Sequence, residues 1–418
     1  MNDRAHRPAI AFELNGRRYG YPAHPTVVIC VDGCEPDYLD RARSAGLLPS
    51  LSRAMSEGYA GLAAAVMPTF TNPNNISIVT GAPPSVHGIS GNYYLDRATG
   101  REIMMTDASL LRSETLLGKF SQAGVATAAV TAKDKLRKAL GHGLKGIAFS
   151  SERAGDCTLA ENGIEGVEDF VGRRAPDTYS ADLSLFVLDA GIRLLETRRA
   201  ELLYLSLSDY VQHKSAPGTA EADAFYAQLD ARVGRLMALG ATVALTADHG
   251  MNDKALPNGD PNVVYLEDAI AGRFGPGLAR VICPITDPYV RHHGALGSFA
   301  RVYVSDKASL DEIARFIGEI AGIELVLSRD DACARFELPP DCEGDLAVVA
   351  ARGAVIGAKR SDHDLSALGG ARLRSHGGLS EQQVPFIVSR RLTRGYAERA
   401  AASLRNFDIF DFAINGVA

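Results

Sequence analysis

The feature that most constrains the fold is a repeated alternation between short apolar runs and longer amphipathic stretches. The apolar runs have the length of buried strands, and the stretches between them show the apolar spacing of helices. This pattern is typical of an α/β sheet covered by helices on both faces. The expected strands are Thr26–Val31, Val125–Val130, Leu202–Leu207, Thr242–Thr246 and Pro385–Ser389, and the expected helices include Leu51–Glu57, Ala181–Glu196 and Ala220–Leu239.

Polar or charged residues follow each of the first four expected strands. They are Asp32, Lys133, Asp209 and Asp248. Because ligands of open α/β sheets bind outside the carboxyl ends of the strands, we expect these four side chains to converge.

The pattern changes between about Asn252 and Leu373, where strand-like and helix-like segments alternate with loops rich in Gly, Pro and Asp. We interpret this part as an inserted, smaller α+β cap domain. The predicted division is a catalytic core of residues 1–252 and 374–418 and a cap of residues 253–373. An insertion beside the strand ends would act as a lid or specificity cap, and a decoration without a role at the site is the alternative.

Composition excludes several classes of protein. With 44 basic and 50 acidic residues the net charge is -6, so no basic footprint for nucleic acid is expected. No apolar stretch approaches the roughly 20 residues of a membrane span, and residues 1–20 have no signal-peptide core. We therefore expect a cytoplasmic protein without a membrane partner. The sequence leaves a homodimer open.

Acidic and histidine residues, rather than cysteines, are the candidate metal ligands. The six cysteines include no C-x-x-C pair, and we expect reduced, packed thiols. Asp209 and His213 would share one face of a helix, whereas His376 lies in a glycine-rich bend. Carboxylate and imidazole ligands suit zinc, and six are too many for one tetrahedral ion but suit two. The six residues are Asp32, Asp209, His213, Asp248, His249 and His376.

A nucleophile is expected near a helix N-terminus, because two-metal sites recur in phosphoryl chemistry and free amides there favour phosphate. The segment Met67–Gly81 fits this expectation. Pro73 suits the first helical turn and Asn72 suits an N-cap. Thr71 would then lie just before the cap, with Thr69 as its competitor.

Taken in order, these segments resemble the alkaline phosphatase superfamily. The matching motifs are a strand followed by Asp-Gly, P-S-L-S-R-A-M-S-E-G, M-P-T-x-T-x-P-N, T-G-x-x-x-x-x-H-G-I-x-x-N, D-x-x-x-H, D-H-G-M and a late H-G-G. Within the superfamily the chain is similar to the nucleotide pyrophosphatase/phosphodiesterase branch, and most of all to the phosphonoacetate hydrolases. The resemblance covers about Thr26–Asn252, resumes near Arg374, and implies an alkaline-phosphatase-like central sheet.

The resemblance implies two zinc ions and a set of site residues. Asp209, His213 and His376 would hold one ion. Asp32, Asp248 and His249 would hold the other, with Thr71 as a further ligand. Thr71, which is followed by x-P-N, matches the family's nucleophile. Asn92 matches an amide that donates to a phosphoryl oxygen, and the T-A-K-D-K-L stretch matches lysines that receive the substrate carboxylate. The implied substrate-binding residues are Asn92, Lys133, Lys135 and His213.

The function implied is hydrolysis of the carbon–phosphorus bond of phosphonoacetate, a small anionic phosphonate, to acetate and phosphate through a phosphothreonine intermediate. The alternative is a nucleotide pyrophosphatase/phosphodiesterase that uses the same site, with Tyr93, Tyr94 or Tyr210 as a platform for a nucleoside. A metal-dependent phosphoglycerate mutase fits less well because that relative resembles a serine-nucleophile pattern. A non-catalytic metal-binding protein is the remaining alternative.

Overall fold

The computed structural model describes residues 11–105, 108–285 and 295–418. Its largest sheet has seven strands in the order β4-β19-β10-β3-β9-β7-β8. The five strands from β10 to β8 run parallel, whereas β19 is antiparallel to both of its neighbours, so the sheet is mixed. The strands are β3 (Thr26–Cys30), β4 (Tyr59–Ala64), β7 (Thr127–Thr131), β8 (Ile147–Ser150), β9 (Leu202–Ser206), β10 (Thr242–Thr246) and β19 (Gln383–Val388).

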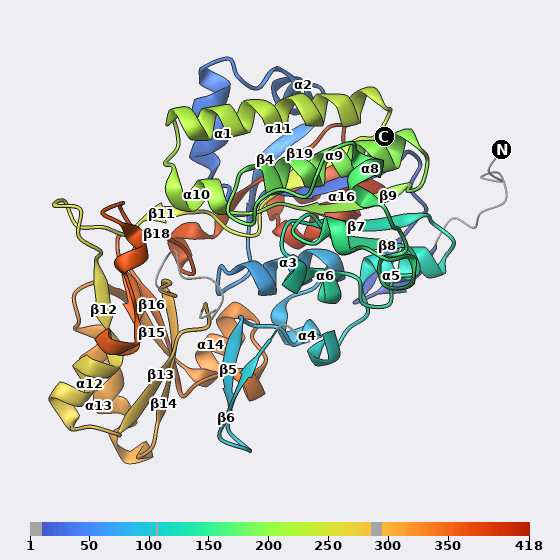
Figure 1. Cartoon of the computed structure of the whole chain (residues 1–418). Helices are drawn as coiled ribbons and strands as arrows, with labels where there is room; N and C mark the ends of the chain where they lie inside the picture. Colours follow the sequence, from blue (N-terminus) through green and yellow to red (C-terminus); the bar gives the residue numbers. More distant parts are fainter. Residues whose placement is uncertain (1–10, 106–107, 286–294) are drawn as a thin grey trace.

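Helices cover both faces of this sheet (Figure 1). All residues of β3, β7, β9 and β10 are buried, which explains their continuous apolar sequences. The helices of one face are α1 (Pro36–Ser44), α2 (Pro49–Glu57), α9 (Asp182–Glu196) and α11 (Ala220–Ala238). The helices of the other face are α3 (Thr71–Thr80), α5 (Leu116–Gln122) and α16 (Ile409–Ile414).

The predicted α/β class is confirmed, and the five expected strands and three expected helices form with ends within two residues of those predicted. The two edge strands, β4 and β8, were not among them. β4 has the sequence YAGLAA and several partly exposed side chains, and β8 has four residues, so neither forms a long apolar run.

The chain leaves and re-enters the core through two paired strands, β11 (Asn252–Asp253) and β18 (Arg374–Ser375). Between them lies an antiparallel sheet in the order β13-β14-β16-β15. Its strands are β13 (Ala279–Ile282), β14 (Phe299–Val304), β15 (Ile323–Ser328) and β16 (Leu346–Ala350). The insertion also contains β12 (Val263–Tyr265), α12 (Leu266–Phe274), α13 (Leu310–Gly318), α14 (Arg329–Phe336) and β17 (Val355–Gly357).

The inserted sheet has its own apolar cluster, in which Val302 and Val348 are fully buried. Met67 and Phe70, which precede α3, belong to the same cluster, so the insertion packs against the segment that carries Thr71. A hairpin of β5 (Tyr93–Asp96) and β6 (Arg101–Met104) extends beside β13 (Figure 1). The division into a core and a cap domain stays a prediction.

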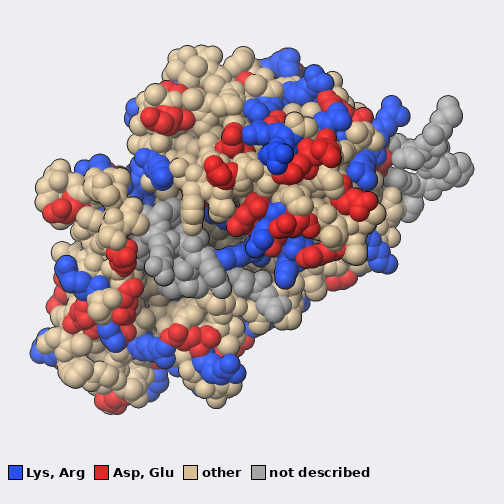
Figure 2. Space-filling view, viewed as in Figure 1, with Lys and Arg blue, Asp and Glu red and all other residues tan. Residues whose placement is uncertain are grey.

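The remaining elements are short. They are β1 (Phe12–Leu14), β2 (Arg17–Tyr19), α4 (Pro84–His87), α6 (Asp134–Leu140), α7 (Leu159–Asn162), α8 (Val167–Val171), α10 (Tyr210–Lys214) and α15 (Arg394–Ala402). Among the described residues, none of the helices combines the length and apolarity that a bilayer crossing requires. The prediction for residues 1–20 rests partly on residues 1–10, which lie outside the described residues. Basic and acidic side chains are interspersed over the face seen in Figure 2.

One packing contact substitutes for a missing helix cap. The residue before α2, Leu48, has no side chain that can accept a hydrogen bond from the helix. Asp230 of α11 accepts hydrogen bonds from the backbone amides of Ser50 and Leu51, at 3.0 and 2.7 Å. Asp230 is buried, so its charge is stabilised by these amides and by the positive end of α2.

Asp230→Ala should lower the free energy of unfolding by about 0.5–2 kcal/mol, the usual range for a lost N-terminal cap. Urea unfolding followed by circular dichroism measures this change. Gln228→Ala, at an exposed position of the same helix, is the matched control and should be neutral. Equal stability of the two variants would contradict a capping role for Asp230.

Candidate functional site

The four side chains that follow the strands converge, as predicted. Asp32, Lys133, Asp209 and Asp248 lie two or three residues after the ends of β3, β7, β9 and β10. The Lys133 ammonium lies 2.7 Å from Asp209 Oδ1 and 3.3 Å from Asp32 Oδ2. The backbone amide of Gly33 donates to Asp248 Oδ1 at 3.2 Å.

The structure brings the six predicted metal ligands together in two buried groups. Within each group the possible ligand atoms lie within 4.8 Å of one another. Asp209 immediately precedes α10, so His213 lies one helical turn further on, and its Nε2 is 3.0 Å from Asp209 Oδ2. The first group is Asp209, His213 and His376, and the second is Asp32, Asp248 and His249.

All three imidazole rings are oriented in the same way. Each Nδ1 lies within hydrogen-bonding distance of a backbone carbonyl oxygen. A carbonyl oxygen can only accept, so Nδ1 carries the proton, and Nε2 presents its lone pair to the site in the neutral ring. The pairs are His213 with Arg374 at 2.9 Å, His249 with Gly250 at 2.8 Å and His376 with Thr69 at 2.8 Å.

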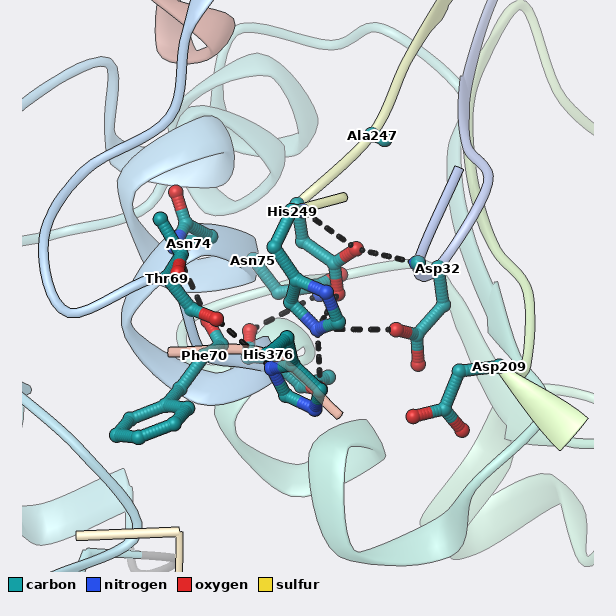
Figure 3. A network of polar contacts seen from close by, with 12 residues as sticks. Asp32, Thr69, Phe70, Asn74, Asn75, Asp209, Ala247, His249 and His376 are labelled. Atoms are coloured by element: carbon teal, nitrogen blue, oxygen red, sulfur yellow. Dashed lines mark hydrogen bonds and ion pairs between the residues drawn. The ribbon is translucent and has the colours of Figure 1, made fainter. Parts of the chain in front are cut away.

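The two ligand groups touch through stacked rings (Figure 3). The His249 and His376 ring centroids are 3.6 Å apart, with 7° between the planes. Burial, together with the neighbouring His249 and His213 rings, lowers the pKa of His376 well below its usual value. His376 is therefore neutral near pH 7, as a metal-ligating imidazole must be.

The carboxylates repel one another strongly. Burial and the charges of Asp209 and Asp248 raise the pKa of Asp32 well above its usual range. Burial would also raise the pKa of Asp209, but the charge of Lys133 and the contact with His213 outweigh burial and hold that pKa well below its usual value. Burial disfavours the Lys133 charge, yet Asp209 and Asp32 raise its pKa. Added positive charge would relieve this repulsion.

The residues present fit a divalent cation in each group. Asp32 Oδ1 is buried and has no hydrogen-bond partner among the described residues, although His249 Nε2 lies 3.3 Å away. Each group combines carboxylate oxygens with at least one imidazole nitrogen, which is a donor set that zinc and similar cations accept.

Helix α3 begins at Thr71, and Phe70, whose backbone is extended, is the preceding N-cap residue. The prediction that Asn72 is the N-cap is therefore wrong. An N-cap at Asn72 would start the helix at Pro73, whereas the helix starts two residues earlier, at Thr71. The Asn72 side chain instead donates to the Met105 carbonyl at 3.4 Å. Pro73 lies in the first turn, as predicted.

The two candidate threonines differ in their surroundings. Thr71 Oγ1 lies 3.3 Å from His249 Nε2. Thr69 is fully buried, donates to the Gly378 carbonyl at 2.9 Å and accepts from the Gly377 amide at 3.0 Å. The Thr69 hydroxyl thus holds the loop of His376, and the Thr71 hydroxyl faces the ligand groups.

A cavity of about 690 Å³ opens beside the two ligand groups. The backbone amide of Asn92 donates to the Pro284 carbonyl at 2.7 Å, which fixes this residue at the cavity wall. Both lysines of the T-A-K-D-K-L stretch line the cavity, and so do two tyrosines, Tyr179 and Tyr210. The predicted site residues that line it are Thr71, Asn92, Lys133, Lys135, Asp209 and His376.

Asn75 was not among the predicted site residues, but it links the nucleophile segment to a ligand. Its amide nitrogen donates to Asp248 Oδ2 at 3.0 Å and to the Thr71 carbonyl at 3.1 Å. Its amide oxygen accepts from Tyr204 and Ser206 hydroxyls at 2.7 and 2.9 Å. A second asparagine directly after Pro-Asn, on a helix that is buried along most of its length, is the sequence signal for such a residue.

The Asp32→Asn variant tests, without substrate, whether the buried charge of Asp32 destabilises the metal-free protein. A pKa that is raised by folding contributes stability below the unfolded pKa, and this contribution is lost as the pH rises through the folded pKa. The chelator-treated Asp32→Asn variant should therefore be more stable than the chelator-treated wild type at pH 8. The difference should vanish near pH 4, where Asp32 is protonated in the folded protein.

Zinc chloride should raise the wild-type Tm at pH 8, because only the native state offers the assembled ligands. The increase should be smaller in Asp32→Asn, which lacks one charged ligand. Calorimetric melts with and without zinc measure both effects. A less stable metal-free variant with an unchanged zinc response would contradict this account.

Comparisons with known proteins agree with this geometry. The type I phosphodiesterase/nucleotide pyrophosphatase family model matches residues 26–378. Phosphonoacetate hydrolase from Sinorhizobium meliloti 1021, solved in complex with phosphonoformate, is 49% identical, covers 97% of this chain and 98% of its own, and has a TM-score of 0.92. Its complex with phosphonoacetate is 48% identical, with the same coverage and TM-score.

More distant relatives show the fold or a short segment alone. Human ectonucleotide pyrophosphatase/phosphodiesterase 5 is 16% identical, covers 94% of this chain and 96% of its own, and has a TM-score of 0.62. Phosphonoacetate hydrolase from Penicillium oxalicum is 62% identical over 32 residues, which is 8% of this chain. The chain spans 16%, 8% and 44% of the lengths of three curated relatives that it matches.

These similarities confirm the predicted alkaline-phosphatase-like fold and the predicted branch. The family model extends over most of the 418 residues, from the first strand of the central sheet to the loop of His376. The chain therefore belongs to the type I phosphodiesterase/nucleotide pyrophosphatase family.

Proposed function

We propose that this hydrolase uses two zinc ions to cleave the carbon–phosphorus bond of phosphonoacetate, releasing acetate and phosphate through a phosphothreonine intermediate. The observation that carries the proposal is one cavity lined by a threonine hydroxyl, an asparagine amide and two lysines beside two groups of metal ligands. The similarity to an enzyme solved with phosphonoacetate supports the choice of substrate.

One zinc ion would be held by each ligand group, with Thr71 Oγ as a further ligand of the ion at Asp32, Asp248 and His249. Bound zinc would supply positive charge that lowers the pKa of a hydroxyl or water and offsets charge on phosphoryl oxygens. The orientation of the three imidazole rings prepares their Nε2 atoms for this role before any ion binds.

The reaction then has two displacement steps. The Thr71 oxygen loses its proton to solvent and attacks phosphorus in line, a phosphorus–oxygen bond forms, and the carbon–phosphorus bond breaks. The electron pair of the broken carbon–phosphorus bond leaves with the carbon, which gives the enolate of acetate. This enolate then takes a proton from water. A second water hydrolyses the phosphothreonine, which restores the hydroxyl and releases phosphate. Asn92 would donate to a phosphoryl oxygen as its charge develops.

Lys133 and Lys135 would receive the substrate carboxylate and stabilise the leaving enolate. The two lysines differ in their surroundings, because the Lys133 ammonium also pairs with two ligand carboxylates. Lys133 therefore connects the metal groups to the substrate, whereas Lys135 acts on the substrate side. His213 belongs to the first ligand group, and its ring is oriented by the Arg374 carbonyl. His213 would also contact the substrate phosphonate.

A phosphodiesterase acting on nucleotides is the second candidate. The observation in its favour is that Tyr179 and Tyr210 line the same cavity, where an aromatic face stacks well on a base. This candidate needs no carboxylate-binding lysine. The two lysines at the cavity favour a carboxylated phosphonate instead.

Thr71→Ala should reduce phosphate release from phosphonoacetate to background and leave the zinc content unchanged, because the nucleophile is lost but the six carboxylate and imidazole ligands persist. Thr71→Ser, which keeps a hydroxyl, should retain part of the activity. Phosphate assays, with metal analysis of the same samples, test this prediction. Turnover by Thr71→Ala at the wild-type rate, or wild-type turnover in the presence of a strong chelator, would refute the mechanism.

Lys135→Met should raise KM for phosphonoacetate about tenfold to a hundredfold, the loss expected for one charged hydrogen bond of roughly 1.5–3 kcal/mol. An aryl phosphate diester without a carboxylate should be hydrolysed as before. Lys133→Met should impair both reactions and weaken zinc retention. A variant Lys135→Met that loses both activities equally, or a wild type that strongly prefers nitrophenyl diesters, would favour the phosphodiesterase.

A further inference from the structure

The segment that carries Asn92 is held by an arginine of the insertion. Arg301, on β14, is fully buried, and its guanidinium donates to backbone atoms on both sides of Asn92. Nη2 donates to the Ser90 carbonyl at 2.8 Å and to Ser90 Oγ at 2.9 Å, and Nη1 donates to the Tyr93 carbonyl at 2.9 Å. Nε and Nη2 also bind the two oxygens of Glu343, at 2.8 and 2.6 Å.

The pairing with Glu343 offsets the free-energy cost of burying the Arg301 charge. A buried guanidinium without a counter-charge would be strongly destabilising, whereas a two-point contact with a carboxylate compensates the charge and fixes the plane of the group. Glu343 is also buried. With its charge compensated, Arg301 still has donors that point to Ser90 and Tyr93, and no aliphatic side chain could replace them.

The backbone between these contacts is packed closely on the same side. A Cβ atom added at Gly91 would lie 2.8 Å from Pro284 Cβ and 3.3 Å from the Arg301 guanidinium. The Asn92 amide donates to the Pro284 carbonyl at 2.7 Å, and the Asn92 carbonyl accepts from the Met105 amide at 2.8 Å. The backbone of residues 90–93 is therefore fixed by the insertion and by the hairpin that follows.

The Asn92 side chain itself has few constraints. Its amide nitrogen makes one long contact, 3.5 Å to the Ile285 carbonyl, and its buried Oδ1 has no hydrogen-bond partner among the described residues. The position of this amide in the cavity thus depends on the backbone that carries it. An error of about 1 Å in such a group can cost a hundredfold in rate.

We propose that Arg301 is a positioning residue of the active site: it fixes the Asn92 backbone relative to Thr71 and so makes the insertion part of the catalytic machinery. The proposal rests on the proposed role of Asn92 as the donor to the phosphoryl group. It assigns the insertion a function in alignment that does not require the insertion to move.

Arg301→Lys tests this role, because lysine keeps the charge opposite Glu343 but lacks the planar fork that reaches Ser90 and Tyr93. The expected result is a kcat for phosphate release that is about tenfold to a hundredfold lower, with bound zinc unchanged. Amide hydrogen exchange over residues 88–96 should become faster, whereas exchange of β15 and β16 should not. Arg301→Gln with Glu343→Gln, which removes both buried charges, should give the same two effects and guards against a folding defect of the single variant.

A double-mutant cycle with Asn92→Ala distinguishes positioning from a general loss of structure. If Arg301 acts through Asn92, Arg301→Lys should reduce kcat in the wild-type background and have little further effect once Asn92 is alanine. An equal loss in both backgrounds, or wild-type kcat in Arg301→Lys, would overturn the proposal.

Arg329→Lys is the matched control, since Arg329 of the insertion pairs with Asp345 and, within the part of the chain that the structure describes, does not contact residues 90–93. It should change neither kcat nor exchange over residues 88–96. If the wild-type chain released no phosphate from phosphonoacetate, the proposed function would fail. Hydrogen exchange would still test whether Arg301 fixes the backbone of residues 88–96. Unchanged exchange over residues 88–96 in Arg301→Lys would then overturn the positioning role by itself.

Discussion

Mutual repulsion of three buried carboxylates, Asp32, Asp209 and Asp248, is the constraint on which the rest of the site depends. Their interaction is strong because they lie away from water at one end of the central sheet. Lys133 compensates two of them, and Asp248 accepts hydrogen bonds from the Gly33 and His249 amides and from Asn75. A cation in each ligand group would complete this compensation, so the architecture of the sheet edge favours bound metal.

The imidazole rings connect this electrostatic centre to the connectivity of the fold. His213 is oriented by the carbonyl of Arg374, which lies where the chain returns from the insertion, and His376 is oriented by the carbonyl of Thr69. The Arg374 guanidinium in turn donates to the carbonyls of Gln212 and Met251. The first ligand group can therefore form only when the core, the nucleophile segment and the returning chain have docked.

Much of the core could be predicted from the sequence, because buried parallel strands are apolar along their whole length and the residues after them share one sheet edge. Edge strands such as β4 are only half buried, so they lack that signal. The helix start at Thr71 was misjudged because Asn72 is a good N-cap by residue type, whereas its side chain reaches Met105 instead. Asn75 was missed since its role depends on Tyr204 and Ser206 of β9.

The sequence by itself determined which chemical groups are available and in what order: carboxylates and imidazoles after strands, a threonine at a helix start, lysines after a fourth strand. Only the tertiary structure decided which imidazole nitrogen faces the site, which carboxylates Lys133 pairs with, and which residue of the insertion holds the Asn92 segment. Local sequence can encode periodicity and residue type. The other three features depend on hydrogen bonds between residues up to several hundred positions apart, which only the folded chain brings within reach.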